Sequence, residues 1–448
     1  MPFERSTKCF LGIILLLSLT LSFGLLRKES KDCESDDVRT RLTDLSKTLD
    51  HHIVEVKKLI EKVSTSDVKE SCSHHNRIQN IIEVVEEELD RVPDFSPVMC
   101  PCPNNKDDTY PVYPIEFAIF EEKLRVPSKA KDRAFAAHIP GKPYPFSLEE
   151  EYDNDYAASY YAFTMKKGGW DCMRHWEILA SGTVPYFSNL EHLPANTMRG
   201  FPRKAIEKLM KLPGVLVTVN VTTKQCCDEI GSFAIDWNVF PKRVYNRLNL
   251  LLHQYSKRHL TTRALARSML NVTGHGNASK VLMILDRLDC CREGQSGSRV
   301  LADYLDLTVF HGFKLLLGRN FHSYPLDLEF MYDDFPAEKA LQMYGKGFTY
   351  SRRLQNSLKG PIVNETTMLT RIREESYDVI IYGAPSGAGL PLFSQVTKSY
   401  QENPSRIFHL NGEDTSQPPQ YQYDSCALAT EMYQRGAQYG HSVFLREM

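Results

Sequence analysis

The sequence lacks a strong charge of either sign. Its 448 residues include 54 lysines and arginines against 56 aspartates and glutamates, which gives a formal net charge of −2. Without a basic field the chain has no global attraction to polyanions, and this argues against nucleic acid as a partner. With 42% hydrophobic and 25% charged residues, the composition is that of a folded protein, and the length allows two or three domains.

Long apolar runs are scarce as well. Only Cys9 to Leu26, eighteen residues without a charge, is long enough to cross a hydrocarbon core as a helix. We predict a cytoplasmic tail over 1–8 and a transmembrane signal anchor over 9–26. A cleaved signal peptide is the alternative, because Ser22 and Gly24 are small residues at a position suited to processing.

Features after this run indicate a lumenal body. Charges flank both of its ends, so the positive-inside rule does not decide the orientation. Potential N-glycosylation triplets follow it at Asn220, Asn271, Asn277 and Asn364. Ten of the eleven cysteines also follow it, an even number that suits disulfides of unspecified pairing. We therefore expect a single-pass type II membrane protein.

Zinc is the less favoured reading of some of these cysteines. The group would consist of Cys72, His74, His75, Cys100 and Cys102. Its spacing matches no standard zinc module, so we predict no metal site there.

Heptad spacing predicts a helical coiled-coil stem over 27–92. Leu42, Leu49, Val56 and Val63 recur every seven residues, with charges between them. A second amphipathic stretch, Ile78 to Val92, follows a breaker-like run at Ser71–Asn76. The stem either self-associates into a homo-oligomer or forms a helical hairpin packed on itself. Six prolines between Pro93 and Pro114 then predict a linker over 93–112.

Short apolar strands separated by helix-length amphipathic runs predict an α/β body. We expect two Rossmann-like domains, at 113–279 and 280–448, with helices between Trp237 and Ala266 bridging them. The expected strands of the second domain are Val281–Leu285, Val379–Tyr382 and Ile407–Leu410. Its expected helices are Ser298–Leu317, Leu392–Tyr400 and Cys426–Gln434.

The run from Tyr160 to Phe187 has the pattern of a strand, a loop, a helix and a strand. The loop is predicted over Lys166–Trp170, the helix over Cys172–Ser181 with Asp171 as its N-cap, and the second strand from Val184. A helix that begins directly after a strand and a glycine-containing loop is a typical site for phosphate.

Five residues of this run suit a nucleotide diphosphate. Gly168 and Gly169 let the backbone approach phosphate oxygens, and Lys166 adds positive charge. Arg174 and Glu177 share one helix face, so a cation for phosphate and a carboxylate for ribose hydroxyls can point into one cleft. The structural alternative is a βαβ corner in which the glycines only form turns and Arg174–Glu177 is a surface pair.

The run from Tyr160 to Phe187 resembles the donor-site sequence of a known family. Arg174, Glu177, Gly182, Val184 and Pro185 follow the donor-site pattern Arg-x-x-Glu-x-x-x-x-Gly-x-[Val/Ile]-Pro of exostosin-like glycosyltransferases and, more loosely, of other GT-B enzymes. The resemblance implies that Glu177 binds the ribose and that Arg174 lies near the diphosphate. It covers about thirty residues. Family members often have Ser and Cys where this chain has Cys172 and Thr183, and GT-B enzymes usually place the donor half second, not first.

Two carboxylates are candidates for a general base. Glu413 and Asp414 follow the strand Ile407–Leu410, and loops at strand C-termini are where α/β sheets bind ligands. One of them could activate an acceptor hydroxyl in an inverting transfer. The alternative is an N-cap or a solvated turn.

Three further cations and two histidines are weaker candidates for a binding or catalytic site. Lys346, Arg352 and Arg353 form either an anion site or a turn with an exposed helix start. His311 and His409 lie in apolar surroundings, where we expect histidines with satisfied hydrogen bonds and no catalytic role.

Taken with the resemblance, these features predict a Golgi glycosyltransferase of GT-B-like fold that uses a nucleotide sugar and a glycan or glycoprotein acceptor. We expect no cofactor and no required metal, because Asp286, Asp289 and Asp303 do not form the short Asp-x-Asp motif of metal-dependent transferases. A sulfotransferase is less favoured, since no early Gly-x-x-Lys-Ser/Thr signature follows a first strand. The alternative from another class is a non-catalytic lumenal carbohydrate-binding or scaffold protein with a degenerate transferase fold.

Overall fold

The computed structural model describes residues 65–140, 145–220, 229–285, 304–325, 327–360, 363–383, 390–414, 426 and 429–448, with six isolated positions between 43 and 54. The chain divides into two units, Met1–Gln79 and Asn80–Met448. The expected transmembrane span at 9–26 and the heptad positions from Leu42 to Val63 lie outside the described residues. Within the described ranges, no helix combines the length and apolar character needed to cross a bilayer.

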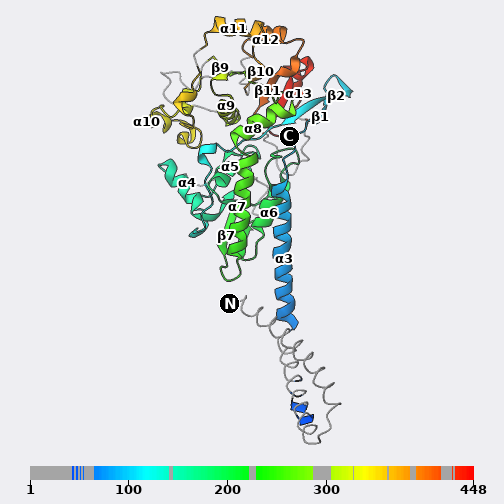
Figure 1. Cartoon of the computed structure of the whole chain (residues 1–448), viewed down its shortest axis with the longest axis vertical. Helices are drawn as coiled ribbons and strands as arrows, with labels where there is room; N and C mark the ends of the chain where they lie inside the picture. Colours follow the sequence, from blue (N-terminus) through cyan, green and yellow to red (C-terminus); the bar gives the residue numbers. More distant parts are fainter. Residues whose placement is uncertain are drawn as a thin grey trace, which may run out of the picture. The chain divides into compact units, whose positions relative to one another are not determined.

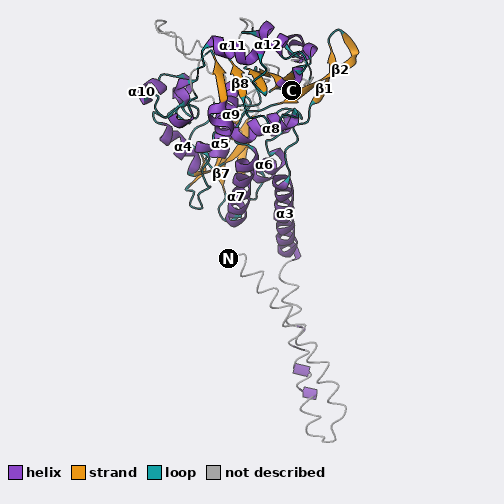
Figure 2. Ribbon diagram, turned by 45° about the horizontal axis from the view of Figure 1, so that its top comes forward, coloured by secondary structure: helices purple, strands orange, loops and turns teal. Residues whose placement is uncertain are grey.

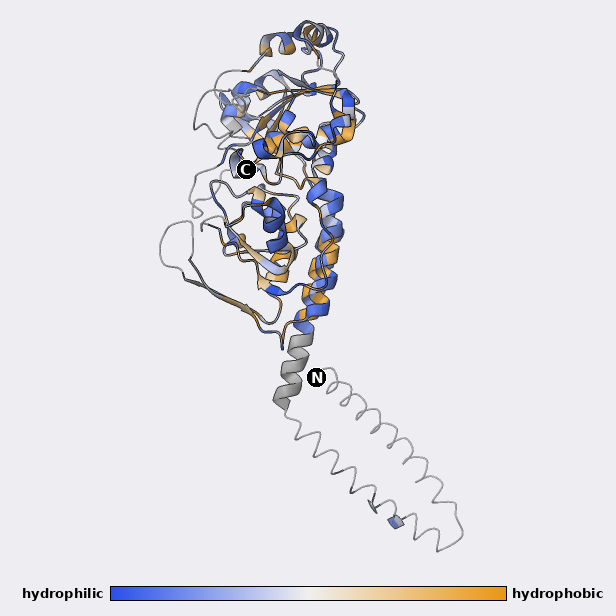
Figure 3. Ribbon diagram, turned by 90° about the vertical axis from the view of Figure 1, so that its left-hand side faces the viewer, coloured by the Kyte–Doolittle hydropathy of each residue, from blue (hydrophilic) through white to orange (hydrophobic). Residues whose placement is uncertain are grey.

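The first long helix is α3, Thr65–Asp90, which contains both hydrophilic and hydrophobic residues (Figure 3). It runs without interruption through Ser71–Asn76, so the predicted break is wrong: that stretch contains neither glycine nor proline. The predicted amphipathic helix from Ile78 is confirmed as far as Asp90. Its residues Ile81, Val85 and Leu89 are buried in the main core, and each contributes about 1.5–3 kcal/mol by burial.

The protein is α/β, with a mixed seven-stranded sheet in the order β1-β2-β12-β11-β10-β8-β9 (Figures 1 and 2). Only β1 and β2 pair antiparallel, and all the other neighbours are parallel. The strands are β1 Val98–Cys102, β2 Asn105–Pro114, β8 Val281–Ile284, β9 Phe321–Tyr324, β10 Val379–Tyr382, β11 Ile407–Asn411 and β12 Ser442–Leu445.

Helices cover both faces of this sheet. Alternate residues of β8 point to opposite faces, so Met283 packs in the main core with α9 and Ile284 packs in a second core with α11 and α12. The helices attached to this sheet are α9 Tyr304–Leu317, α10 Ala337–Ala340, α11 Glu365–Arg373, α12 Phe393–Ser399 and α13 Ala429–Arg435. The predicted strands and helices of this part are confirmed to within a few residues, except that 298–303 and 427–428 lie outside the described residues.

The stretch 93–112 is not the linker that its prolines predicted, because β1 and most of β2 lie within it. Tyr110 and Val112 are buried, and Val112 pairs with Val443 of β12. Pro101 lies on the edge strand β1, where a missing N–H is tolerated. The larger sheet therefore combines strands from either side of the expected domain boundary at residue 280.

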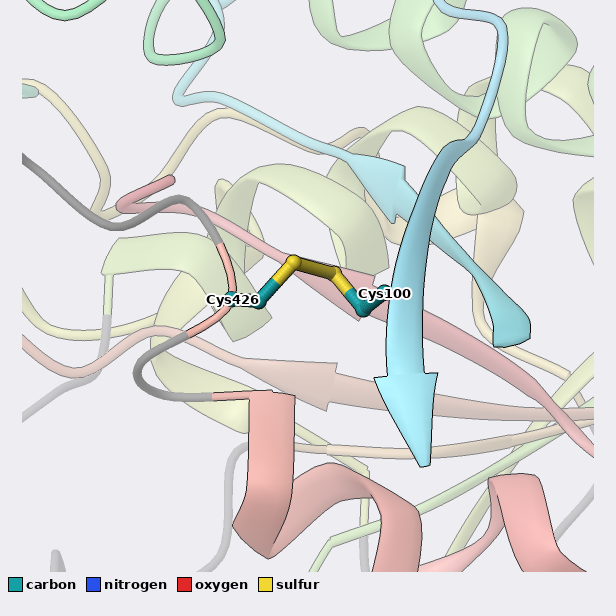
Figure 4. The surroundings of a disulfide bond; sticks show 2 residues. All are labelled: Cys100 and Cys426. Atoms are coloured by element: carbon teal, nitrogen blue, oxygen red, sulfur yellow. A yellow bond between two sulfur atoms is a disulfide. The ribbon is translucent and has the colours of Figure 1, made fainter. Parts of the chain in front are cut away.

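A disulfide fastens this hairpin to the C-terminal part of the chain. Cys100 of β1 is bonded to Cys426, which precedes α13 (Figure 4). The prediction that disulfides form is confirmed for this pair. Cys100 is consequently no longer available to the zinc group that the sequence offered as an alternative.

A second, smaller sheet of three parallel strands lies in the order β3-β4-β5. These strands are β3 Arg133–Phe135, β4 Ser159–Thr164 and β5 Val184–Phe187. A separate antiparallel hairpin joins β6 Val215–Asn220 to β7 Glu229–Ile235. The surrounding helices are α4 Glu149–Ala157, α5 Met173–Ala180, α6 Arg203–Met210, α7 Lys242–His259 and α8 Thr262–Val272.

Candidate functional site

The predicted unit of strand, loop, helix and strand is present as β4, the loop 165–172, α5 and β5. Every residue of β4 is buried, and Trp170 and Trp176 are wholly buried on either side of the helix start. Cys172, not Asp171, occupies the N-cap position. Asp171 is instead a buried acceptor, bonded by the Phe117 N–H at 2.7 Å and by the Trp176 indole N–H at 2.8 Å.

His175 fixes both ends of the loop. Its Nε2 lies 2.8 Å from the Trp170 carbonyl and its Nδ1 lies 2.7 Å from the Thr164 hydroxyl. A carbonyl oxygen can only accept, so Nε2 carries the hydrogen and Nδ1 accepts from Thr164. Burial lowers the pKa of His175 to about 3, and the ring is neutral at physiological pH.

Gly168 and Gly169 face carboxylates. A Cβ on Gly168 would lie 2.1 Å from Asp414 Oδ2, and one on Gly169 would lie 2.3 Å from Glu447 Oε1. The N–H groups of Trp170 and Asp171 donate to Glu447 at 3.1 and 2.9 Å. At both glycines the backbone lies close to the protein's own acids, and the predicted approach to phosphate oxygens stays a prediction.

Arg446 joins this loop to the strand ends of the larger sheet. Its five N–H groups bond the carbonyls of Asp171 and Gly412 and the carboxylates of Glu447 and Asp414, the last at 2.5 Å. Its guanidinium also lies 4.6 Å from the centroid of the Phe117 ring. With every donor used, Arg446 orients Asp414 and has no N–H left for a ligand.

The two predicted catalytic carboxylates differ in their surroundings. Asp414 lies against Gly168 and Gly169, with 55% of its side chain exposed. Glu413 is exposed, and its backbone N–H donates to Asn411 Oδ1 at 2.9 Å. Asp414 is thus the acid that the fold brings to the predicted loop.

Behind Asp414 lies a group of buried acids. Burial raises the pKa of Asp171 to about 7, although Arg446 acts to lower it. Burial also raises the pKa of Glu447, and it raises that of Glu116 strongly, with Asp171 adding to the effect. These acids bind protons more readily than exposed carboxylates, which limits the negative charge beside the loop.

Arg174 and Glu177 lie one turn apart on α5, and both are half-buried. In the described part of the chain, the Arg174 guanidinium has no hydrogen bond or ion pair. Burial acts to lower the pKa of Arg174, but Tyr156, Tyr152 and Glu177 outweigh it and the pKa is raised, so the group is charged. Arg174 and Glu177 therefore lie on one face of α5, as their spacing predicted, and their opening into one cleft stays a prediction.

Glu177 is held from two sides. Its Oε2 accepts from the Tyr152 hydroxyl at 2.5 Å and its Oε1 accepts from the Thr349 hydroxyl at 2.6 Å. Tyr152 comes from α4, whereas Thr349 comes from the segment between β9 and β10. The sequence offered no signal for either contact, because both partners are remote in the chain.

The remaining predicted cations have other roles. Lys166 is buried, with its ammonium 5.9 Å from the centroid of a Trp170 ring. Lys346 donates to the Phe146 carbonyl at 2.5 Å, Arg352 to the Asp333 carbonyl at 3.1 Å, and Arg353 to Glu149. Lys346, Arg352 and Arg353 therefore help to hold the turn-rich segment from 344 to 353 in place, as the predicted turn requires, but no exposed helix begins at the two arginines.

The two singled-out histidines are buried and each has a polar partner, and their lack of a catalytic role stays a prediction. His311 Nδ1 lies 2.7 Å from the Thr262 hydroxyl, and His409 Nε2 lies 3.0 Å from His441 Nδ1. Arg446 and Glu447 were missed, although the rule that singled out Glu413 applies to them: they directly follow β12, whose end lies beside that of β11.

Comparison with known proteins gives no relative: no family model matches the chain, and no curated protein or solved structure matches it.

Proposed function

We propose that the chain is a glycosyltransferase that binds a nucleotide sugar at Arg174 and Glu177. The observation that carries this proposal is the charged, half-buried Arg174, which has no hydrogen bond or ion pair in the described part of the chain. Partial burial of a charge without a partner has a free-energy cost, because some of its hydration is lost and nothing replaces it. A diphosphate would compensate that cost, since its oxygens match the planar donors of a guanidinium.

Glu177 supports the same ligand. Each of its oxygens accepts one hydroxyl, which leaves one or more lone pairs on each oxygen for a further donor. A ribose diol supplies two neighbouring hydroxyls. The resemblance of Arg174, Glu177, Gly182, Val184 and Pro185 to the exostosin-like donor pattern adds a second, independent reason for this assignment.

Asp414 is the proposed general base. It is partly exposed beside Gly168 and Gly169, and Arg446 fixes its orientation. An acceptor hydroxyl bound between the two sheets would give its proton to Asp414 as its oxygen attacks the sugar. The bond from the sugar to the diphosphate breaks, and the nucleotide departs with both bonding electrons.

The proposal also includes the arrangement of the α/β domains. We infer two Rossmann-like halves of GT-B type, with the donor site in the smaller half. In the larger sheet, β9 lies on one side of β8 and β10 on the other, and ligands of parallel sheets bind outside such a reversal of strand order. The acceptor would accordingly lie near the strand ends of β8, β10 and β11.

The proposed location is the Golgi membrane, with a type II anchor at 9–26 and a lumenal body. The Cys100–Cys426 disulfide supports an oxidising compartment, where such bonds persist.

A second candidate is a lumenal carbohydrate-binding or scaffold protein with a degenerate transferase fold. Glu447 favours it, because this carboxylate already accepts from the Trp170 and Asp171 N–H groups at the start of α5. Those are the groups that a phosphate would otherwise use.

The experiment that separates the two is a binding and hydrolysis screen of the full chain across common nucleotide sugars. The transferase predicts saturable binding of at least one donor and slow hydrolysis of it. Absence of binding by every donor would support the scaffold.

A further inference from the structure

The segment Tyr344–Arg353 has an unusual backbone. Three of its non-glycine residues have positive φ angles: 60° at Lys346, 76° at Thr349 and 59° at Arg352. For a β-branched residue such as Thr349 this conformation is a genuine outlier, with a cost of order 1–3 kcal/mol. Strain of this kind persists only where the surroundings enforce it, and it concentrates at functional sites.

The surroundings of Thr349 are well defined. Its N–H donates to Glu149 Oε1 at 2.7 Å, and its carbonyl accepts from Arg353 Nε at 2.9 Å. Burial acts to raise the pKa of Glu149, but Arg353 and Lys123 outweigh it and lower the pKa to about 2, so this anchor is ionised. The strained backbone is thus fixed to α4 by a charged group.

The result of this anchoring is the position of one hydroxyl. The Thr349 side chain, only 2% exposed, donates to Glu177 Oε1 at 2.6 Å. Tyr152 donates to the other oxygen, so the plane of the carboxylate cannot rotate without breaking one of two bonds. Thr349 belongs to the part of the chain between two strands of the larger sheet, whereas Glu177 lies on the helix that follows β4.

We propose that Thr349 is a positioning residue that orients Glu177 toward the two hydroxyls of a ribose, and that it makes the site selective for ribonucleotides over 2′-deoxyribonucleotides. This inference rests on the proposed function of Glu177. A carboxylate held at both oxygens presents its remaining lone pairs in one fixed arrangement, which suits two neighbouring hydroxyls. A carboxylate free to rotate would bind one hydroxyl nearly as well as two.

Three substitutions at Thr349 distinguish the effect of its hydroxyl from the effect of its strained backbone. Thr349→Val keeps the shape and removes the hydroxyl. Thr349→Gly removes the hydroxyl and relieves the strain, because glycine adopts positive φ freely. Thr349→Ser restores the hydroxyl. The full chain and these variants would be titrated with uridine and guanosine diphosphates and with their 2′-deoxy forms, and their melting temperatures recorded.

We expect Thr349→Val and Thr349→Gly to bind the preferred ribonucleoside diphosphate about tenfold more weakly, as for the loss of one hydrogen bond to a charged group. Their preference for ribose over deoxyribose should fall at least threefold. Thr349→Ser should keep both properties, and Thr349→Gly should melt no lower than Thr349→Val.

Each other outcome overturns a specific claim. If the wild-type chain binds nucleoside diphosphates and all three variants match it, the role of Thr349 is refuted and the proposed function stands. Weaker binding with an unchanged ribose preference, or failure of Thr349→Ser to restore it, refutes the orienting role. If the wild-type chain binds none of the four compounds, the proposed function fails and this inference fails with it.

Discussion

Asp414 and Glu413 are adjacent acids with different surroundings, and this offers a matched test of the proposed base. Asp414→Asn keeps the oxygen that Arg446 bonds but loses the ability to take a proton. We expect sugar transfer to fall about 10²–10⁴-fold, the usual contribution of a general base, while donor affinity changes little. The measurement is kcat for transfer, alongside the donor Kd.

Glu413→Gln is the control for this prediction, since Glu413 is exposed and follows the same strand. It should retain wild-type transfer. Equal losses in the two variants, or an Asp414→Asn chain that transfers within threefold of wild type, would remove Asp414 from the mechanism.

At the residue scale, the sequence predicts contacts that are local and misses those that depend on packing. Arg174 and Glu177 could be placed on one face because helix geometry fixes residues three apart. The Thr349 hydroxyl bonds Glu177, which is 172 residues away in the chain. The Glu447 carboxylate bonds the N–H groups of Asp171 and Trp170, which are 276 and 277 residues away. No periodicity encodes such a meeting.

At the scale of elements, the loop between β4 and α5 depends on the neutral His175. The folded pKa is about 3 and lies below the value of about 6.5 expected in the unfolded chain. The stability that the neutral ring contributes is complete above pH 6.5 and is lost as the pH falls toward 3. Glutamine at 175 keeps a donor and an acceptor and does not titrate.

We therefore expect the stability of the wild type relative to His175→Gln to fall by about 1.4 kcal/mol for each pH unit below 6.5. Urea unfolding of both chains at pH 7, 6 and 5 measures this difference. His192→Gln, at an exposed histidine, is the control and should show no comparable pH dependence. A difference that stays constant from pH 7 to pH 5 would contradict the neutral, doubly bonded ring.

Elements whose sequences show a clear hydrophobic pattern were predictable, and elements whose sequences lack such a pattern were not. β5 and β10 have the predicted bounds, because each is a short apolar run between turn residues. The hairpin of β1 and β2 was hidden by its prolines, and its stability comes from pairing with β12, which lies at the far end of the sequence.

At the scale of the whole molecule, the Cys100–Cys426 bond joins positions 326 residues apart. Removing a disulfide typically costs about 2–5 kcal/mol of stability. We expect Cys100→Ser with Cys426→Ser to lower the free energy of unfolding by about that amount, and reductant to affect the wild type more than this double variant.

Unfolding in urea with and without reductant tests this bond. The control is Cys172→Ser, which alters a free cysteine and should leave the effect of reductant on the free energy of unfolding the same as in the wild type. A wild-type chain no more sensitive to reductant than the double variant would show that the bond does not stabilise the fold.

The measurement that tests the central claim most directly is titration of the full chain with a nucleotide sugar, comparing the wild type with Arg174→Ala and with Arg267→Ala, which changes an exposed arginine of α8. We predict saturable binding by the wild type and by Arg267→Ala. Affinity should be about 10–100-fold weaker for Arg174→Ala, as for the loss of charge-assisted hydrogen bonds, with the melting temperature preserved. Equal binding by all three chains, or binding by none, would contradict the account.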